Sequence, residues 1–394
     1  MSPDELHQEA QALAESLTHD RRHLHRHPEL AGEERQTAQF IAGRLRRLGL
    51  EPELLLDGTA AFADLEGEGG DGPTLLLRAD TDALPIQERH EEREYRSEVA
   101  GAMHACGHDG HVAIALGAAE LLQRRRAGIR GRVRIVFQPA EETANGAERL
   151  IEAGVMDHPQ ADAALGLHLW GGARVGLVGV RDDAIFASAD EFELELRGRG
   201  GHAALPHQAL DPVPIAALVV LALQTLVSRE TDPAQTAVVT VGMVRAGQAF
   251  NVIPELVTLR GTVRSFTEEA RQRLLRRVEE LARAICQGYG AELEMRLGAA
   301  CPPVICDPRI SALVRRAVAG TPGAEATLPQ PLTVGDDMAL FLRRVPGCYF
   351  LLGAGAAEEG FSAPHHHPDF DIDERCLPVG AEVLARSALE YLGA

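Results

Sequence analysis

The sequence contains no lysine, and its 39 basic residues are all arginine. Asparagine is nearly absent as well, and occurs only at Asn145 and Asn251. Schiff-base enzymes, pyridoxal-phosphate enzymes and P-loop nucleotidases each depend on a lysine. These three classes of enzyme are therefore excluded.

Long apolar segments and cysteine pairs are also lacking. The longest apolar run, residues 215–223, is too short to cross a bilayer, so we expect no membrane partner. The six cysteines are scattered without a CxxC pair, and the polar, acidic N-terminus does not resemble a signal peptide. These features predict a reduced, cytoplasmic protein. The net charge of -19 would repel phosphate backbones, which argues against nucleic acid as a partner.

The 394 residues exceed the size at which one hydrophobic core usually stops growing, so two domains are expected. In the first part of the chain, short apolar runs that end in polar residues alternate with a helical segment. The expected strands cover residues 74–80, 133–137 and 163–169, and the expected helix covers 111–126. This alternation predicts an α/β fold whose functional residues lie at the ends of the strands.

The pattern changes near residue 185. Residues 191–196 alternate between acidic and apolar, as expected for a strand with one face in solvent. The segments that follow are a helix at 214–227, strands near 236–244 and 256–264, a helix at 267–287 and a strand at 291–297. This β-α-β-β-α-β order predicts a ferredoxin-like α+β domain at residues 185–298. It would be inserted into an α/β domain made of residues 1–184 and 299–394.

The densest group of reactive side chains lies in residues 103–111, MHACGHDGH. In an extended segment, residues two apart lie on the same face, so Cys106 and His108 are expected to point the same way. A thiolate and an imidazole are both good ligands for metals such as zinc. A buried cysteine beside surface histidines is the alternative, but three histidines and an aspartate in nine residues favour a metal site.

Two adjacent carboxylates, Glu141 and Glu142, follow the strand expected at 133–137. Neighbouring side chains at the end of a strand point in different directions, so one carboxylate can bind a metal while the other faces the cleft. The second carboxylate could then act as a general base on a water molecule. Acidic residues at a helix N-terminus are the alternative explanation.

The remaining candidates for metal ligands are histidines. His168 lies near the end of the strand expected at 163–169, and residues 365–368 read HHHP. A lone histidine at a strand end is often structural, and three consecutive histidines often form a solvent-exposed loop. A cysteine, several histidines and a glutamate in one α/β domain together favour a metal site over these alternatives.

Seven motifs occur along the chain in the order RADTDALP, MHACGHDGH, QPAEE, GLHLW, GRGGHAALPH, FNVIP and HHP. They closely resemble those of the aminoacylase, hippurate hydrolase and auxin-conjugate hydrolase family of dinuclear metal amidohydrolases. The resemblance covers nearly the whole chain. It implies a catalytic α/β domain with a mixed sheet like that of zinc peptidases, and an inserted lid domain that also forms a dimer. It further implies a site for two divalent metal ions (Zn, Mn, Co or Ni).

The resemblance also implies roles for individual residues. The metal ligands would be Cys106, His108, Glu142, His168 and His366. His366 is chosen among the three histidines because the family pattern is His-x-Pro and Pro368 fixes the register. Which ligand bridges the two metals stays open.

Further residues would assist the reaction in the same family. Glu141 would be the general base, and Asp80 would orient a metal ligand. His202, in the inserted domain, would reach the partner chain's site and help to hold the oxyanion. Asn251 and Arg264 would bind the free carboxylate of the substrate, although a surface arginine is the alternative for Arg264.

The expected reaction is metal-dependent hydrolysis of the amide bond of small N-acyl-L-amino acids, such as N-acetyl or N-benzoyl derivatives. Its products would be a carboxylic acid and a free amino acid, and the protein would be a homodimer or homotetramer. A metallo-carboxypeptidase or dipeptidase with the same two-metal site is the main alternative. A hydrolase of N-carbamoyl groups and an inactive binding protein are further alternatives, but Glu141 and the complete ligand set argue against an inactive protein.

Overall fold

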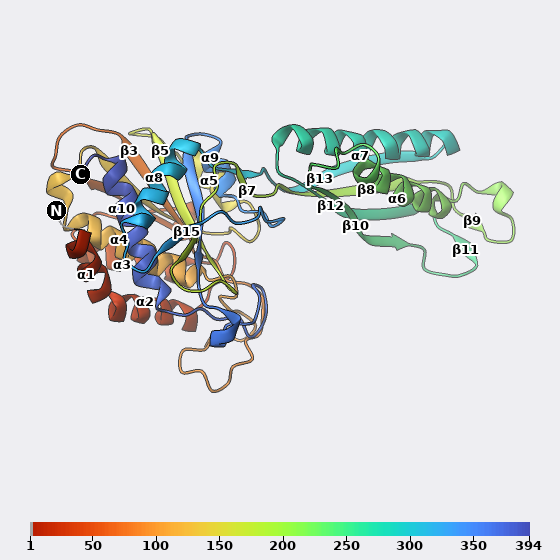
Figure 1. Ribbon diagram of the computed structural model, residues 1–394. Coiled ribbons are helices and arrows are strands. Elements are labelled where there is room, and N and C mark those ends of the chain that lie inside the picture. The colour runs from red at the N-terminus through yellow and green to blue at the C-terminus, as the bar shows by residue number, and fades with distance from the viewer. Residues whose placement is uncertain (1–2) are drawn as a thin grey trace. The chain divides into compact units, whose positions relative to one another are not determined.

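The computed structural model describes residues 3–394, and the chain divides into two compact units (Figure 1). Unit 1 comprises the residues up to 185 together with 305–330 and 337–394, and unit 2 comprises 186–304 and 331–336. The inserted domain predicted at 185–298 ends inside strand β13 (Glu292–Cys301) and omits residues 331–336.

Unit 1 is built around a mixed sheet of eight strands in the order β1-β2-β4-β3-β5-β16-β6-β15. Its strands are β1 (Glu53–Leu55), β2 (Ala60–Glu66), β3 (Thr74–Asp80), β4 (Arg132–Gln138), β5 (Ala163–Trp170), β6 (Leu177–Gly179), β15 (Glu325–Thr327) and β16 (Gly347–Gly353). The four central strands β4, β3, β5 and β16 are parallel, whereas β2 and β6 are antiparallel to their central neighbours. The predicted α/β class with a mixed sheet is confirmed.

Helices cover both faces of this sheet. They are α1 (Pro3–Ala12), α2 (Ala14–Arg26), α3 (Arg35–Arg47), α4 (His108–Gln123), α5 (Gly146–Glu152), α8 (Pro308–Ala319), α9 (Met338–Leu342) and α10 (Cys376–Tyr391). Figure 1 shows α4, α8 and α10 on one side of the sheet and α5 and α9 on the other. Strands β3 and β16 are buried along their whole length, which explains their almost continuously apolar sequences, TLLLRAD and GCYFLLG.

Unit 2 contains an antiparallel sheet of four strands in the order β10-β12-β8-β13. The remaining strands of this sheet are β8 (Ala189–Arg197), β10 (Ala237–Ala246) and β12 (Leu256–Ser265), and the helices are α6 (Pro212–Ser228) and α7 (Glu268–Tyr289). Apolar side chains of both helices pack on the sheet in one core. The chain order β8-α6-β10-β12-α7-β13 is the β-α-β-β-α-β pattern that the sequence predicted.

Within residues 3–394, four short strands lie outside the two main sheets. In unit 2, β9 (Gly201–His202) pairs with β11 (Val252–Ile253). Strands β7 (Ala184–Phe186) and β14 (Val304–Ile305) lie on the two segments where the chain passes from one unit to the other. Within residues 3–394, every helix is too short or too polar to cross a membrane.

Candidate functional site

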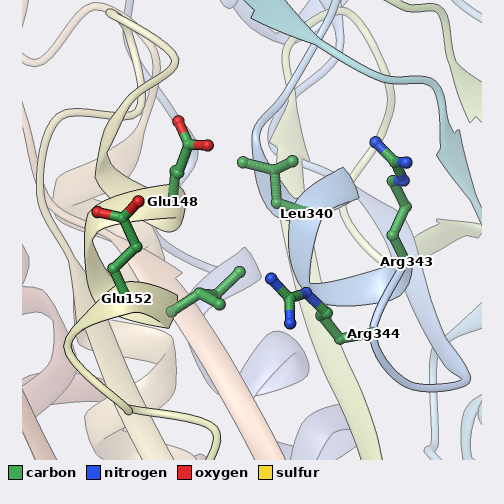
Figure 2. Close-up of a pocket in the computed structure, with 6 residues that line it drawn as sticks. Glu148, Glu152, Leu340, Arg343 and Arg344 are labelled. Atoms are coloured by element: carbon green, nitrogen blue, oxygen red, sulfur yellow. The ribbon is translucent and has the colours of Figure 1, made fainter.

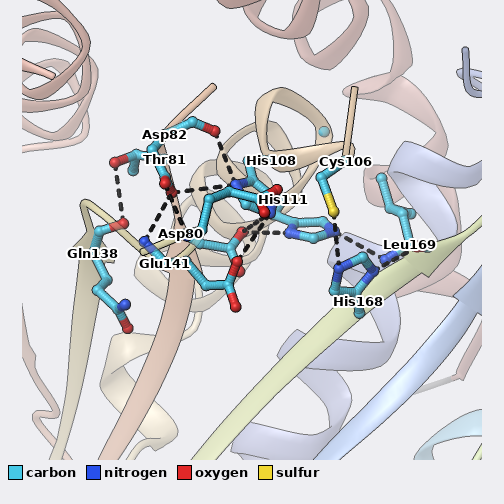
Figure 3. Close-up of polar contacts among 12 residues, drawn as sticks. Asp80, Thr81, Asp82, Cys106, His108, His111, Gln138, Glu141, His168 and Leu169 are labelled. Atoms are coloured by element: carbon cyan, nitrogen blue, oxygen red, sulfur yellow. Dashed lines mark hydrogen bonds and ion pairs between the residues drawn. The ribbon is translucent and has the colours of Figure 1, made fainter. Parts of the chain in front are cut away.

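The parallel strands at the centre of unit 1 bring three polar segments together at one edge of the sheet (Figure 3). Asp80 is the last residue of β3, Glu141 and Glu142 follow β4, and His168 lies near the end of β5. Because β4, β3 and β5 are neighbours and run in the same direction, their carboxyl ends meet. The strand pattern therefore explains why these residues converge.

The cysteine and histidine of the CGH motif do not lie on an extended segment, so this part of the sequence prediction is wrong. Gly107 has a φ of 92°, and His108 is already the first residue of α4. A left-handed turn is easy for glycine, and here it joins the loop to the helix within one residue. Cys106 and His108 still converge, but through this turn and not through the alternation of a strand.

The five predicted metal ligands come together in the structure. Cys106, His108 and His168 form one group whose ligand atoms all lie within 4.8 Å of one another. Cys106, Glu142 and His366 form a second group by the same measure. Cys106 belongs to both groups, so its sulfur lies between two potential cation positions.

Backbone carbonyls fix the histidine rings so that one nitrogen of each faces the group. His108 Nδ1 donates to the carbonyl of Asp82 at 2.9 Å, and His168 Nδ1 donates to that of Leu169 at 2.6 Å. The buried Nε2 of His108 makes no hydrogen bond to any residue that the structure describes. The Nε2 of His168 lies 3.6 Å from the sulfur of Cys106. A divalent metal fits these atoms, because neutral imidazole nitrogens held by such a partner are its usual ligands.

The pKa values of two side chains in the second group, Cys106 and His366, are shifted. Burial raises the pKa of the Cys106 thiol, which disfavours the thiolate. Hydrogen bonds to Cys106 and Glu142 raise the pKa of His366 to about 10. The raised pKa of His366 reflects the anionic partners beside it, and a cation bound among these side chains would be stabilised by the same partners.

Asp80, which the family resemblance assigns to orienting a ligand, and the nearby Asp82 contact different histidines. Asp80 Oδ1 accepts from Nδ1 of His111 at 2.5 Å and lies 3.8 Å from Nε2 of His108. His111 in turn accepts from the backbone N–H of Leu169 through its Nε2 at 2.9 Å. The hydrogen bond that Asp80 makes to a histidine is therefore to His111, whereas the hydrogen bond of the predicted ligand His108 is to the backbone carbonyl of Asp82.

The residues predicted in the inserted domain lie in unit 2. His202 pairs with Val252 across β9 and β11, and Ala203 donates its N–H to the carbonyl of Asn251 at 3.1 Å. His202 and Asn251 are therefore neighbours, and both are exposed. Arg264 is half-buried on β12 and has no ion pair among residues 3–394. Burial lowers its pKa.

A model of peptidase family M20/M25/M40 matches residues 76–390 of the chain. The chain belongs to peptidase family M20/M25/M40. It is 39% identical over 380 residues to the N-acetyl-L-cysteine deacetylase of Bacillus subtilis (strain 168). This match covers 96% of this chain and 89% of that protein. IAA-amino acid hydrolase ILR1-like 2 of Arabidopsis thaliana is 38% identical over 375 residues, or 94% of this chain and 84% of that protein.

A solved structure gives the same result. The crystal structure of the Bacillus subtilis YXEP protein, a dinuclear metal-binding peptidase of the M20 family, matches with a TM-score of 0.86 and 34% identity. The match covers 98% of this chain and 99% of that chain. The family membership that the motifs predicted is confirmed.

The sequence motifs assign no role to His365, although it lies beside the metal-ligand group. His365 accepts from the N–H of Gly171 through Nε2 at 3.2 Å, so its ring proton is on Nδ1, 3.9 Å from the sulfur of Cys106. Its ring packs against Trp170, the only tryptophan of the chain. The run of three histidines at residues 365–367 could have indicated a role for His365, but the family pattern pointed only to His366.

A buried network of hydrogen bonds also joins the carboxyl ends of β3 and β4. Asp337 accepts from Nη2 of Arg78 at 2.8 Å and from Nε2 of Gln138 at 2.7 Å. Nη1 of Arg78 also donates to Asp80 at 2.5 Å. Asp80 is the one member of this network that sequence reasoning named.

A pocket of about 310 Å³ lies elsewhere on unit 1, between α5 and the end of α9 (Figure 2). It is lined by Glu148, Ile151, Glu152, Leu340, Arg343 and Arg344. None of the site residues predicted from the sequence lines this pocket. The pocket and the metal-ligand group are therefore separate features of unit 1.

Proposed function

We propose that the chain hydrolyses the amide bond of N-acyl-L-amino acids, giving a carboxylic acid and a free amino acid. One observation carries this proposal: two groups of metal-ligand atoms share Cys106 and lie directly beside Glu141. The named activities of the relatives support it, because one is an N-acetyl-L-cysteine deacetylase and another is an IAA-amino acid hydrolase. Both names describe the release of an amino acid from an acyl group.

The five predicted ligands would hold two divalent cations of the set Zn, Mn, Co and Ni. Cys106 would be the shared ligand, with His108 and His168 on one side and Glu142 and His366 on the other. When bound, the cations would lower the pKa of water and polarise the acyl carbonyl.

Glu141 would move the protons. Its Oε2 lies 4.0 Å from Nε2 of His108, and its ligand atom groups with those of His108 and Glu142. A carboxylate at this place can take a proton from the attacking water and deliver it to the leaving amine. Glu141 would thus be base in the first step and acid in the second.

His202, Asn251 and Arg264 would bind the rest of the substrate. Ala204 donates its N–H to Nδ1 of His202 at 3.0 Å, so the proton of the neutral ring is on Nε2. This N–H can donate to the oxyanion that forms on the acyl carbonyl. The half-buried Arg264, together with the amide of Asn251, would bind the α-carboxylate.

A homodimer or homotetramer is proposed from the surface of unit 2. Strand β10 lies at an edge of its sheet, and the outer face of α6 exposes Val213, Leu218 and Leu221. An open strand edge beside an exposed apolar face is typical of a subunit interface. In such an assembly His202 would act in the site of the partner subunit. We also propose a reducing, cytoplasmic location, because all six cysteines are free.

A substrate panel tests the proposed function. Metal-free protein would be loaded with Zn, Mn, Co or Ni and assayed on N-acetyl and N-benzoyl amino acids, N-carbamoyl amino acids and dipeptides. The proposal predicts the highest kcat/KM on the N-acetyl or N-benzoyl compounds. A higher kcat/KM on dipeptides would establish the alternative, a carboxypeptidase or dipeptidase with the same metal site.

A further inference from the structure

The turn that carries Glu141 and Glu142 is held by two buried carboxylates. Ala140 donates its N–H to Oε1 of Glu34 at 2.8 Å. Glu141 and Glu142 donate theirs to Oδ1 and Oδ2 of Asp82, each at 3.0 Å. Three consecutive backbone donors that belong to no helix or strand are thus satisfied by side chains from two distant segments of the chain.

Both carboxylates lie in the interior, where their presence calls for a reason. Glu34 is 0% exposed and Asp82 is 1% exposed. A carboxylate is costly to bury unless it accepts several hydrogen bonds. Asp82 accepts two such bonds, from Glu141 and Glu142, and Oε1 of Glu34 accepts one, from Ala140. All three donors belong to the segment that contains the proposed general base.

The backbone conformation at Ala140 shows what the bond to Glu34 achieves. Ala140 has a φ of 55°, in the left-handed region that residues other than glycine avoid. Such a conformation persists when surrounding contacts impose it, and it is frequent at functional sites. The hydrogen bond from Ala140 to Glu34 is such a contact.

Asp82 links this turn to the metal-ligand group. Its carboxylate holds the N–H groups of Glu141 and Glu142, and its backbone carbonyl holds Nδ1 of His108. Asp82 therefore holds both Glu141 and His108, whose Oε2 and Nε2 atoms lie 4.0 Å apart.

We propose that Glu34 and Asp82, here called the carboxylate clamp, are positioning residues that hold Glu141 at the distance its proton transfers require. This inference rests on the proposed function of Glu141 as general base. Neither residue of the clamp would touch the substrate. Their effect would therefore fall on kcat and leave KM nearly unchanged.

The first test is Asp82→Asn, which keeps the shape of the side chain. Asparagine has one acceptor oxygen, so one of the two N–H groups of residues 141–142 would face an amide donor instead. We expect kcat to fall about 10- to 100-fold, because a displacement of about 1 Å can cost 100-fold, while KM changes less than about twofold. The matched control is Glu29→Gln, because Glu29 also accepts two backbone N–H groups, those of Gln36 and Thr37, away from Glu141. The control should retain wild-type kcat.

The second test uses the backbone strain at Ala140. Glycine adopts a positive φ without strain, so Ala140→Gly should make Glu34 less necessary. We expect Glu34→Ala to lower kcat several-fold more in the wild-type background than in the Ala140→Gly background, and Glu34→Gln to retain most of kcat. An equal loss in both backgrounds would show that Glu34 only fills the core, and it would overturn the proposal. This comparison also decides the question if Asp82→Asn does not fold.

Hydrogen exchange gives a readout that does not depend on the substrate. The amides of residues 140–142 should exchange slowly in the wild type and at least about tenfold faster in Asp82→Asn, with other peptides unchanged. Unchanged exchange would overturn the clamp whatever the substrate is. A wild-type protein inactive on every N-acyl amino acid, but with protected amides at 140–142, would contradict the proposed function and leave the clamp itself supported.

Discussion

Glu141 is the residue that the proposed chemistry needs most, since it would both remove and return a proton. Glu141→Gln keeps the size of the side chain and removes its basicity. Loss of a general base typically costs about 10²- to 10⁴-fold, and a residue used twice should reach the upper end. Kinetics combined with elemental analysis should show a loss of at least about 10³-fold with unchanged metal content. A fully active variant would contradict the assignment.

Glu34 should make stability depend on pH. Burial raises its pKa from 4.5 to about 7. For an acid with a raised folded-state pKa, the folded protein binds the proton more tightly, so stability falls as pH rises from 4.5 to 7. The loss amounts to about 3 kcal/mol at pH 7 and above. Glu34→Gln cannot ionise, and it keeps an acceptor for Ala140.

Thermal unfolding of the two metal-free proteins between pH 4 and 8 measures this effect. The Tm of Glu34→Gln relative to wild type should rise between about pH 4.5 and pH 7 and then level off. A difference in Tm that does not vary with pH would mean that Glu34 has an ordinary pKa in the folded protein.

Residue types predicted the metal-ligand group better than they predicted its support. The dense cysteine and histidine segment pointed to a metal site at Cys106 and His108, and the resemblance of the motifs to a known family singled out Glu142. Asp82 and Glu34 were missed because they act on backbone N–H groups, and such contacts leave no spacing in the sequence. The one available signal was the second aspartate of RADTDALP.

At the scale of elements, apolar runs in the sequence predicted the strands well, but the sequence did not show where the turns begin and end. The strand expected at 74–80 is β3, because a sequence buried on both faces is apolar throughout. The helix expected at 111–126 begins at His108 instead, since the left-handed conformation of Gly107 ends the loop three residues earlier. That conformation depends on tertiary contacts as well as on glycine.

Strand β12 carries a direct test of the carboxylate-binding residues. Arg264→Ala should lower kcat/KM about 10- to 100-fold on N-acyl amino acids, since a charge-assisted hydrogen bond contributes roughly 1.5–3 kcal/mol. Asn251→Ala should behave similarly, and substrates with a carboxamide in place of the carboxylate should be poor for the wild type. Arg260→Ala is the matched control, because Arg260 lies on the same strand and is paired with Glu191. If carboxamide substrates react as well as the acids, the carboxylate assignment is wrong.

At the scale of the whole molecule, the order of elements was predictable and the unit boundaries were less so. The alternation of residues 191–196 and the helices around it gave the topology of unit 2. Residues 331–336 join unit 2 through contacts that no local pattern shows. Ala187 donates its N–H to the carbonyl of Leu332 at 3.0 Å, and the Cys301 thiol donates to the carbonyl of Asp336 at 2.8 Å.

A dimer that exchanges His202 between subunits can be tested by mixing two inactive variants. Glu141→Gln and His202→Ala should each be nearly inactive alone. In a mixed dimer one site would combine both defects and the other would be intact. Random reassortment makes about half of the dimers mixed, so roughly a quarter of wild-type activity should return. If verified heterodimers are as inactive as the single variants, His202 acts within its own chain or has no role.

The central claim is a two-metal centre that shares Cys106 and drives amide hydrolysis. Titration of the metal-free protein with Co²⁺, with hydrolysis of an N-acetyl amino acid followed at each step, tests it most directly. We predict no activity without metal, and a rise that saturates at about two ions per chain, one for each group of ligand atoms that contains Cys106. Full activity in the metal-free protein, or saturation at one ion per chain, would contradict the account.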